Sequence, residues 1–173
     1  MAAGLLAAAT PSLADSFHLY SYDPADTVTR EAAGPLTFAF RRGLLHTTLI
    51  NLRSTEAEAS APLKPAGAGV APGWERTLAQ AGTTSRDLYE VESTDEGAAL
   101  ISAFCPGDHR AWMAFGPMKL NADLRIDVLG QASTDRPARL CRTLRFTFHG
   151  EWRLPPGRSI DPRDLEHPRF PGG

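Results

Sequence analysis

The sequence predicts one α+β domain, built mainly from an antiparallel sheet of about six to eight strands with two or three short helices and one disulfide. Three observations predict it. Segments of alternating apolar and polar residues recur along the chain, segments with helix start and stop signals lie between them, and the connections are short and polar. The length of 173 residues and the apolar content of 42% suit a single packed domain, which we expect over residues 15–154.

Period-two alternation marks the strands, because successive side chains of a strand point to opposite faces of a sheet. The strands are expected at residues 17–22, 36–40, 46–53, 88–91, 110–115, 124–129 and about 140–152. The turn residues Arg41, Arg42 and Gly43 join the second and third of these into a hairpin. Residues 56–63 also alternate weakly, but Pro62 and Pro65 restrict this stretch to an edge strand at best, since proline cannot donate to a sheet ladder.

Capping residues and helical spacing mark three short helices. They are expected at residues 24–33, 72–81 and 93–104. The first follows Asp23 as its N-cap and stops at Gly34, and the second stops at Gly82. The third carries the most specific signals, because a Ser-Thr-Asp-Glu run opens its apolar stretch and a Cys-Pro-Gly run closes it.

The N-terminus has features of a secretory signal. Residues 1–14 carry no charge, residues 2–9 are apolar, and small residues at the first and third positions of Ser-Leu-Ala fit a cleavage site that would leave Asp15 as the mature N-terminus. We therefore interpret residues 1–14 as the remnant of a cleaved signal peptide. The positively charged start of such a signal is missing, which indicates that the true start lies upstream. The alternative is an ordinary N-terminal helix of a cytosolic protein. The apolar run is far shorter than the roughly 20 residues of a membrane span.

The two cysteines, Cys105 and Cys141, support the same compartment. Their number is even, and they lack the close spacing of zinc or thioredoxin-like motifs, so we expect them to form a disulfide in a periplasmic or secreted protein. Closing a loop of this length stabilises a fold by about 3 to 4 kcal/mol in the chain-entropy model. The alternative is a pair of unrelated buried thiols.

The end of the chain differs in composition from the rest. Residues 155–173 are rich in proline, glycine and arginine and contain few apolar residues. Such a segment cannot bury enough surface to fold alone, so we expect a disordered or loosely docked tail.

Charge and motifs exclude several functions. The net charge of -2 and the absence of long single-sign runs argue against a nucleic-acid partner. The chain contains no G-x-S-x-G elbow, no phosphate-binding loop with its lysine and no H-E-x-x-H motif. The sequence therefore predicts no cofactor and no identifiable catalytic set.

Two clusters of titratable residues are the nearest approach to an active site. His149 and Glu151 lie two apart on one expected strand, where they would share a face and where His18 or His46 could join them as metal ligands. The second cluster consists of Asp108, His109 and Arg110, which lie in a polar loop next to the expected disulfide. The alternative for each cluster is an ordinary set of solvated side chains.

Tryptophan and arginine side chains near the last strands could form an interaction face, because both residue types are favoured anchors of interfaces. This candidate face consists of Trp112, Arg142, Arg145, Trp152 and Arg153. The alternative is that the tryptophans pack in the core and the arginines are solvated.

These observations favour an exported binding or interaction protein, periplasmic or secreted, over an enzyme. Its partner would be a protein or a small molecule of the cell envelope, and the mature chain would carry no membrane span. The first alternative is a small exported hydrolase or metal-dependent enzyme that uses His149 and Glu151 or His109. The second alternative is a structural envelope protein.

Overall fold

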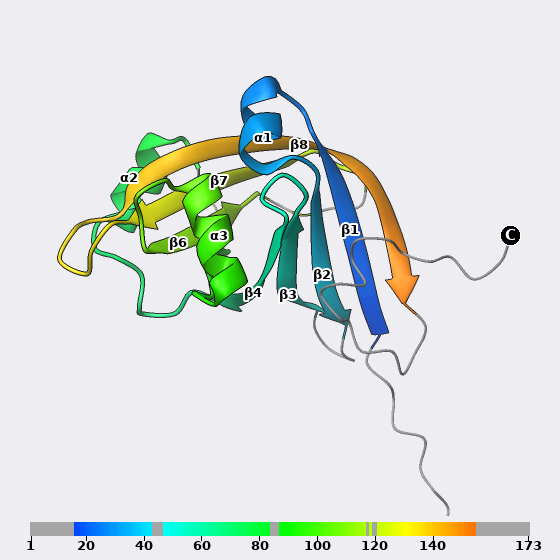
Figure 1. Cartoon of the computed structure of the whole chain (residues 1–173), viewed down its shortest axis with the longest axis horizontal. Helices are drawn as coiled ribbons and strands as arrows, with labels where there is room; N and C mark the ends of the chain where they lie inside the picture. Colours follow the sequence, from blue (N-terminus) through cyan, green and yellow to red (C-terminus); the bar gives the residue numbers. More distant parts are fainter. Residues whose placement is uncertain (1–15, 43–46, 84–86, 117, 119–120, 155–173) are drawn as a thin grey trace, which may run out of the picture.

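The computed structural model describes residues 16–42, 47–83, 87–116, 118 and 121–154. Within them, eight antiparallel strands follow one another around a closed barrel, in chain order (Figure 1). The strands are β1 Ser16–Pro24, β2 Leu36–Arg42, β3 Thr47–Ser54, β4 Ala59–Pro65, β5 Leu88–Val91, β6 Arg110–Phe115, β7 Leu124–Gln131 and β8 Arg139–Leu154. The predicted signal remnant at residues 1–14 and the predicted tail at residues 155–173 lie outside the described residues.

The antiparallel sheet, its number of strands and the three helices agree with the sequence prediction, whereas the α+β class needs correction. The described chain is mostly β, and the sheet closes on itself because β1 pairs with β2 on one side and with β8 on the other. Figure 1 shows β8 running beside β1 over much of its length. Closure removes the unpaired edges that an open sheet exposes.

Large aromatic side chains fill the middle of the barrel. Tyr22, Phe38, Phe115 and Phe146 point inward and are almost completely buried. The ring of Phe38 packs edge-on against Tyr22 at 5.8 Å and against Phe115 at 5.5 Å between ring centroids. Such edge-to-face contacts add about 0.5 to 1.5 kcal/mol each beyond the apolar area they bury.

Two helices contribute side chains to this interior core. The helices are α1 Thr27–Ala33 and α3 Asp95–Phe104. Leu100, Ile101 and Phe104 of α3 are buried in the core cluster of the barrel, together with two alanines of α1. The first helix begins later than predicted, because β1 continues through Pro24 and Asp26, rather than Asp23, caps the helix by accepting a hydrogen bond from the backbone N–H of Thr29.

The remaining helix, α2 Trp74–Gln80, covers the outer face of the barrel. Its buried Leu78 packs against Trp112 of β6 and Leu129 of β7. Because the helix excludes water from this part of the outer face, both the inward-facing and the outward-facing residues of β6 and β7 are buried. A strand buried on both faces shows no clean alternation.

The prediction that the stretch around Pro62 forms an edge strand at best is wrong. Strand β4 pairs with β3 and with β5. Its ladder with β3 ends at Pro62, and its ladder with β5 begins at Leu63. The prolines are tolerated because they lie near the ends of these ladders, and the carbonyl of Pro62 accepts a hydrogen bond from Glu92.

Cys105 and Cys141 form the predicted disulfide, which joins the end of α3 to the start of β8. Cys105 is fully buried and Cys141 is partly buried. The disulfide is compatible with an oxidising, exported location. Among the described residues, none of the helices has the length and apolar character needed to cross a membrane.

Candidate functional site

The candidate site lies where the strands of the barrel differ most in length. Strand β8 pairs with β7 only as far as Phe146, but it pairs with β1 to the end at Leu154. Strand β3 also pairs with β2 as far as Arg42, whereas its ladder with β4 reaches only Asn51. Strands β1, β2, β3 and β8 therefore extend beyond the rest of the barrel, and Figure 1 shows the ends of β1, β2 and β8 lying away from all three helices. We call residues 16–21, 39–42, 47–50 and 147–154 the extension.

The inner face of the extension combines aromatic and ionisable side chains. Alternation along the strands places them on the face that points into the barrel. We call His18, Tyr20, Arg42, Phe148, Glu151 and Arg153 the inner-face cluster. The first two strands and the last strand supply these residues, so only the closed barrel brings them together.

A largely buried, hydrogen-bonded pair of side chains, His18 and Glu151, forms the centre of the inner-face cluster. The Nδ1 atom of His18 lies 2.6 Å from Oε1 of Glu151, and the two side chains are only 8% and 16% exposed. A carboxylate only accepts hydrogen bonds, so Nδ1 of His18 carries the hydrogen and donates it. The hydrogen bond therefore fixes both the orientation and the tautomer of the His18 ring.

Tyr20 places a hydroxyl beside this pair. Its ring packs against Phe40 at 4.9 Å and against Phe148 at 6.2 Å between centroids. Burial raises the pKa of Tyr20, and the Glu151 carboxylate raises it further, while Arg42 and Arg153 act in the opposite direction. The Tyr20 hydroxyl therefore stays protonated at neutral pH and can donate a hydrogen bond.

The aromatic rings of the inner-face cluster keep part of their surface exposed. Tyr20 and Phe148 are partly exposed, although they point inward, whereas Tyr22 and Phe38 deeper in the barrel are fully buried. Arg153 is 73% exposed, with its Nε atom 3.7 Å from Oε1 of Glu151. The extension therefore presents apolar surface next to cationic side chains at the point where the packed core ends.

The structure does not bring His149 and Glu151 onto one face. A register shift between Ser21 and Tyr22 of β1 marks a bulge at this point of β8, and the extra residue breaks the alternation. His149 is exposed, pairs with Asp23 at 2.7 Å and stacks on Trp152, while Glu151 pairs with His18 on the inner face. The predicted approach of His18 to Glu151 thus occurs without His149.

The other two histidines of the prediction do not join this site. His46 lies outside the described residues. His109 is exposed in the loop that follows the disulfide, where its backbone N–H bonds to the carbonyl of Gln131.

The five residues of the predicted interaction face do not form one surface. Trp112 is fully buried under α2, and Trp152 is partly buried on the outer face of the extension. Arg142 is partly buried and donates a hydrogen bond to the backbone at the end of α3. Arg145 and Arg153 are exposed on opposite faces of β8. Arg145 points outward, because both of its chain neighbours point into the barrel, whereas Arg153 lies on the inner face with Glu151.

Sequence reasoning did not identify Tyr20 and Arg42 as site residues. The alternation of the first strand gave a local signal for Tyr20, because it places Tyr20 on the same face as His18. No local signal connects either residue to Glu151, since the contact depends on pairing between the first and the last strand.

Comparison with known proteins assigns no family to this chain. No protein-family model, no curated protein and no solved structure matches it. The geometry of the inner-face cluster is therefore the basis for a functional assignment.

Proposed function

We propose that this protein is an exported binding protein, periplasmic or secreted, that binds a small amphipathic anion at the inner-face cluster. The ligand would carry an acidic group, such as a carboxylate or sulfonate, on an aromatic or aliphatic body. One observation carries the proposal: inward-facing aromatic rings remain partly exposed beside two arginines, around a buried His18–Glu151 pair.

The aromatic surface favours an apolar ligand body. An eight-stranded barrel has room inside for side chains or for one small ligand, and here the middle is filled by rings such as Phe38. Tyr20 and Phe148, which are partly exposed, lie next to this filled region, at the end where the extension begins. A ligand would therefore bind at the extension, with its apolar body against these two rings.

The polar groups favour an acidic head. Arg42 and Arg153 bring two positive charges to the inner face, and Glu151 brings one negative charge, which is already engaged by His18. The Tyr20 hydroxyl adds a neutral donor. Arginine is well suited to an anionic oxygen pair, because its planar group can donate two parallel hydrogen bonds.

Binding of the fluorescent anion anilinonaphthalene sulfonate to the natively folded chain tests the proposal. We expect saturable binding that a medium-chain fatty acid displaces. Arg153→Gln should weaken it by about tenfold, because a hydrogen bond to a charged group contributes roughly 1.5 kcal/mol or more. Arg145→Gln is the matched control, since Arg145 is an exposed arginine on the opposite face of the same strand. Absence of saturable binding, or equal effects of the two substitutions, would refute the proposal.

A second candidate function is hydrolysis, and the 2.6 Å hydrogen bond between His18 and Glu151 favours it. A carboxylate that orients a histidine is a common arrangement of a general base. This function requires turnover of an ester or amide that His18→Gln abolishes. Turnover that survives His18→Gln and Glu151→Gln would exclude the pair as the catalytic base.

A further inference from the structure

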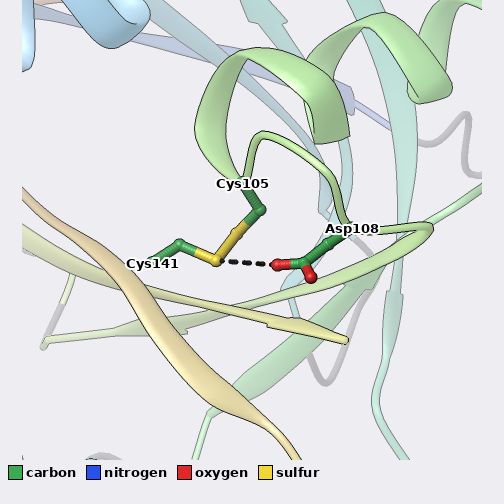
Figure 2. Close-up of side chains that lie close together, drawn as sticks. All are labelled: Cys105, Asp108 and Cys141. Carbon is green, nitrogen blue, oxygen red and sulfur yellow. Dashed lines mark hydrogen bonds between the residues drawn. A yellow bond between two sulfur atoms is a disulfide. The ribbon is translucent and has the colours of Figure 1, made fainter. Parts of the chain in front are cut away.

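We propose that Cys105, Cys141 and Asp108 form a binding site for zinc, or for another thiophilic divalent metal ion, when the disulfide is reduced. Figure 2 shows the three side chains pointing toward one another from the end of α3, the following turn and the start of β8. The two Sγ atoms and a carboxylate oxygen of Asp108 all lie within 4.8 Å of one another.

Asp108 lacks part of its hydrogen bonding in the oxidised protein, as expected of a side chain that can also bind a metal ion. Its side chain is 1% exposed. Oδ2 forms an ion pair with the half-exposed Arg139 at 2.8 Å, but Oδ1 is buried without a hydrogen-bond partner among the described residues. A buried carboxylate oxygen without a partner costs free energy, so this carboxylate has bonding capacity left for a cation besides Arg139.

The contact between Asp108 and Cys141 also fits the reduced protein better. Oδ2 of Asp108 lies 3.3 Å from Sγ of Cys141, the contact that Figure 2 marks with a dashed line. A disulfide sulfur carries no hydrogen, so the oxidised pair lacks a donor for this contact unless the carboxyl is protonated. After reduction, the thiol of Cys141 can donate its hydrogen to Oδ2.

A glycine of β7, Gly130, leaves room for the side chains of Cys141 and Asp108. A Cβ atom on Gly130 would lie 2.6 Å from Sγ of Cys141 and even closer to Oδ2 of Asp108. The glycine is not required by its backbone, because its φ is not in the positive range. Its role at this position is therefore to accommodate the sulfur and the carboxylate.

Reduction of the disulfide requires an external reductant, and a dithiol can supply the two electrons. One of its thiolates attacks Sγ of Cys141, the more exposed of the two cysteines, so that the S–S bond breaks and Cys105 leaves as a thiolate. The second thiol of the reductant then attacks the mixed disulfide and releases Cys141, while the reductant becomes a disulfide. The protein gains two electrons and two protons. A metal ion M²⁺ then displaces two protons and binds two thiolates and the carboxylate.

The donor set matches the chemistry of zinc. Two thiolates balance the charge of the ion, Arg139 offsets the charge of the carboxylate, and water can occupy the fourth position of a tetrahedral site. Ligand atoms of such a site lie roughly 3 to 4 Å apart, given metal–ligand distances of about 2.0 to 2.3 Å. The disulfide itself blocks the site in an oxidising compartment, so metal binding is confined to conditions in which the reductant is supplied.

The test compares zinc binding by the oxidised and the phosphine-reduced forms of the tag-free chain, in competition with a chromophoric chelator. We expect one zinc ion per reduced chain and none per oxidised chain. Cobalt in place of zinc should give thiolate-to-metal charge-transfer absorption. Asp108→Asn should weaken zinc binding at least about tenfold, because it replaces a charged ligand. His109→Ala is the matched control, since it removes a neighbouring exposed side chain that could also bind metal.

Several results would overturn the proposal. Reduced wild-type chain that keeps its circular dichroism spectrum and binds no zinc would exclude the site. Equal zinc affinities for Asp108→Asn and the wild type would exclude the carboxylate, and a loss of binding in His109→Ala would assign the third ligand elsewhere. If Asp108→Asn fails to fold, the cobalt spectrum of the reduced wild type still decides whether both thiolates bind the same ion.

Discussion

Replacing Gly130 by alanine should destabilise the protein strongly, although it adds a single methyl group. The backbone of Gly130 accepts alanine, so the effect arises from contacts alone. The new Cβ would overlap Sγ of Cys141, which the disulfide holds in place, and the buried carboxylate of Asp108. Overpacking of a filled interior typically costs about 1 to 3 kcal/mol. Because both neighbours are constrained, we expect a loss of about 2 to 3 kcal/mol, near the upper end.

Urea and thermal unfolding followed by circular dichroism measure this loss. For a chain of this size the melting temperature should fall by about 4 to 12 °C. Gly116→Ala is the matched control, since its Cβ would meet only the carbonyl of Arg125 at an ordinary distance of 3.6 Å. The double variant Gly130→Ala/Asp108→Ala should lose about 1 kcal/mol less stability than the sum of the losses of the two single variants. A stability of Gly130→Ala within about 0.5 kcal/mol of the wild type would refute the packing described around the disulfide.

Three further predictions concern other parts of the fold. Burial raises the pKa of Tyr22 from 10.0 to about 12, so the neutral phenol stabilises the fold below pH 10. We expect about 3 kcal/mol of stability to be lost as the pH rises from about 10 to above 12. Urea unfolding at several pH values should show that Tyr22→Phe removes this part of the loss; an unchanged slope would contradict it. The double change of Cys105 and Cys141 to serine should lower the free energy of unfolding by about 3 to 4 kcal/mol in urea, given the sequence separation of 36, and a smaller loss than about 1 kcal/mol would argue against a structural disulfide. Thr94→Ala should cost about 1 kcal/mol in thermal unfolding, because Thr94 accepts a hydrogen bond from the backbone of α3, whereas Ser93→Ala should cost almost nothing; equal effects would rule out the cap.

Local signals predicted most of the individual elements. Strands β5 and β6 have the predicted bounds, and α3 lies within the predicted range because Thr94 caps its start. These signals act within a few residues of the element that they define. The disulfide was also predictable, since the chain contains only two cysteines.

Features that depend on distant contacts were not predictable from one sequence. Closure of the barrel depends on pairs such as Phe17 with Leu154, which no local pattern announces. The bulge in β8 shows the limit of alternation within a single strand. One extra residue beside Gly150 moves Glu151 to the inner face with His18 and leaves His149 exposed near Asp23, although sequence spacing places the two on one face.

The pairing of β1 with β8 has a consequence for how the chain reaches its native state. Strand β1 acquires its second neighbour only after β8 is available, so every shorter nascent chain exposes the outer edges of two unfinished strands. Contacts between the ends of a chain raise its contact order and slow its folding. Until the last strand docks, the growing chain is open to pairing with other chains. The rate of this last docking step therefore determines how long the protein is exposed to aggregation.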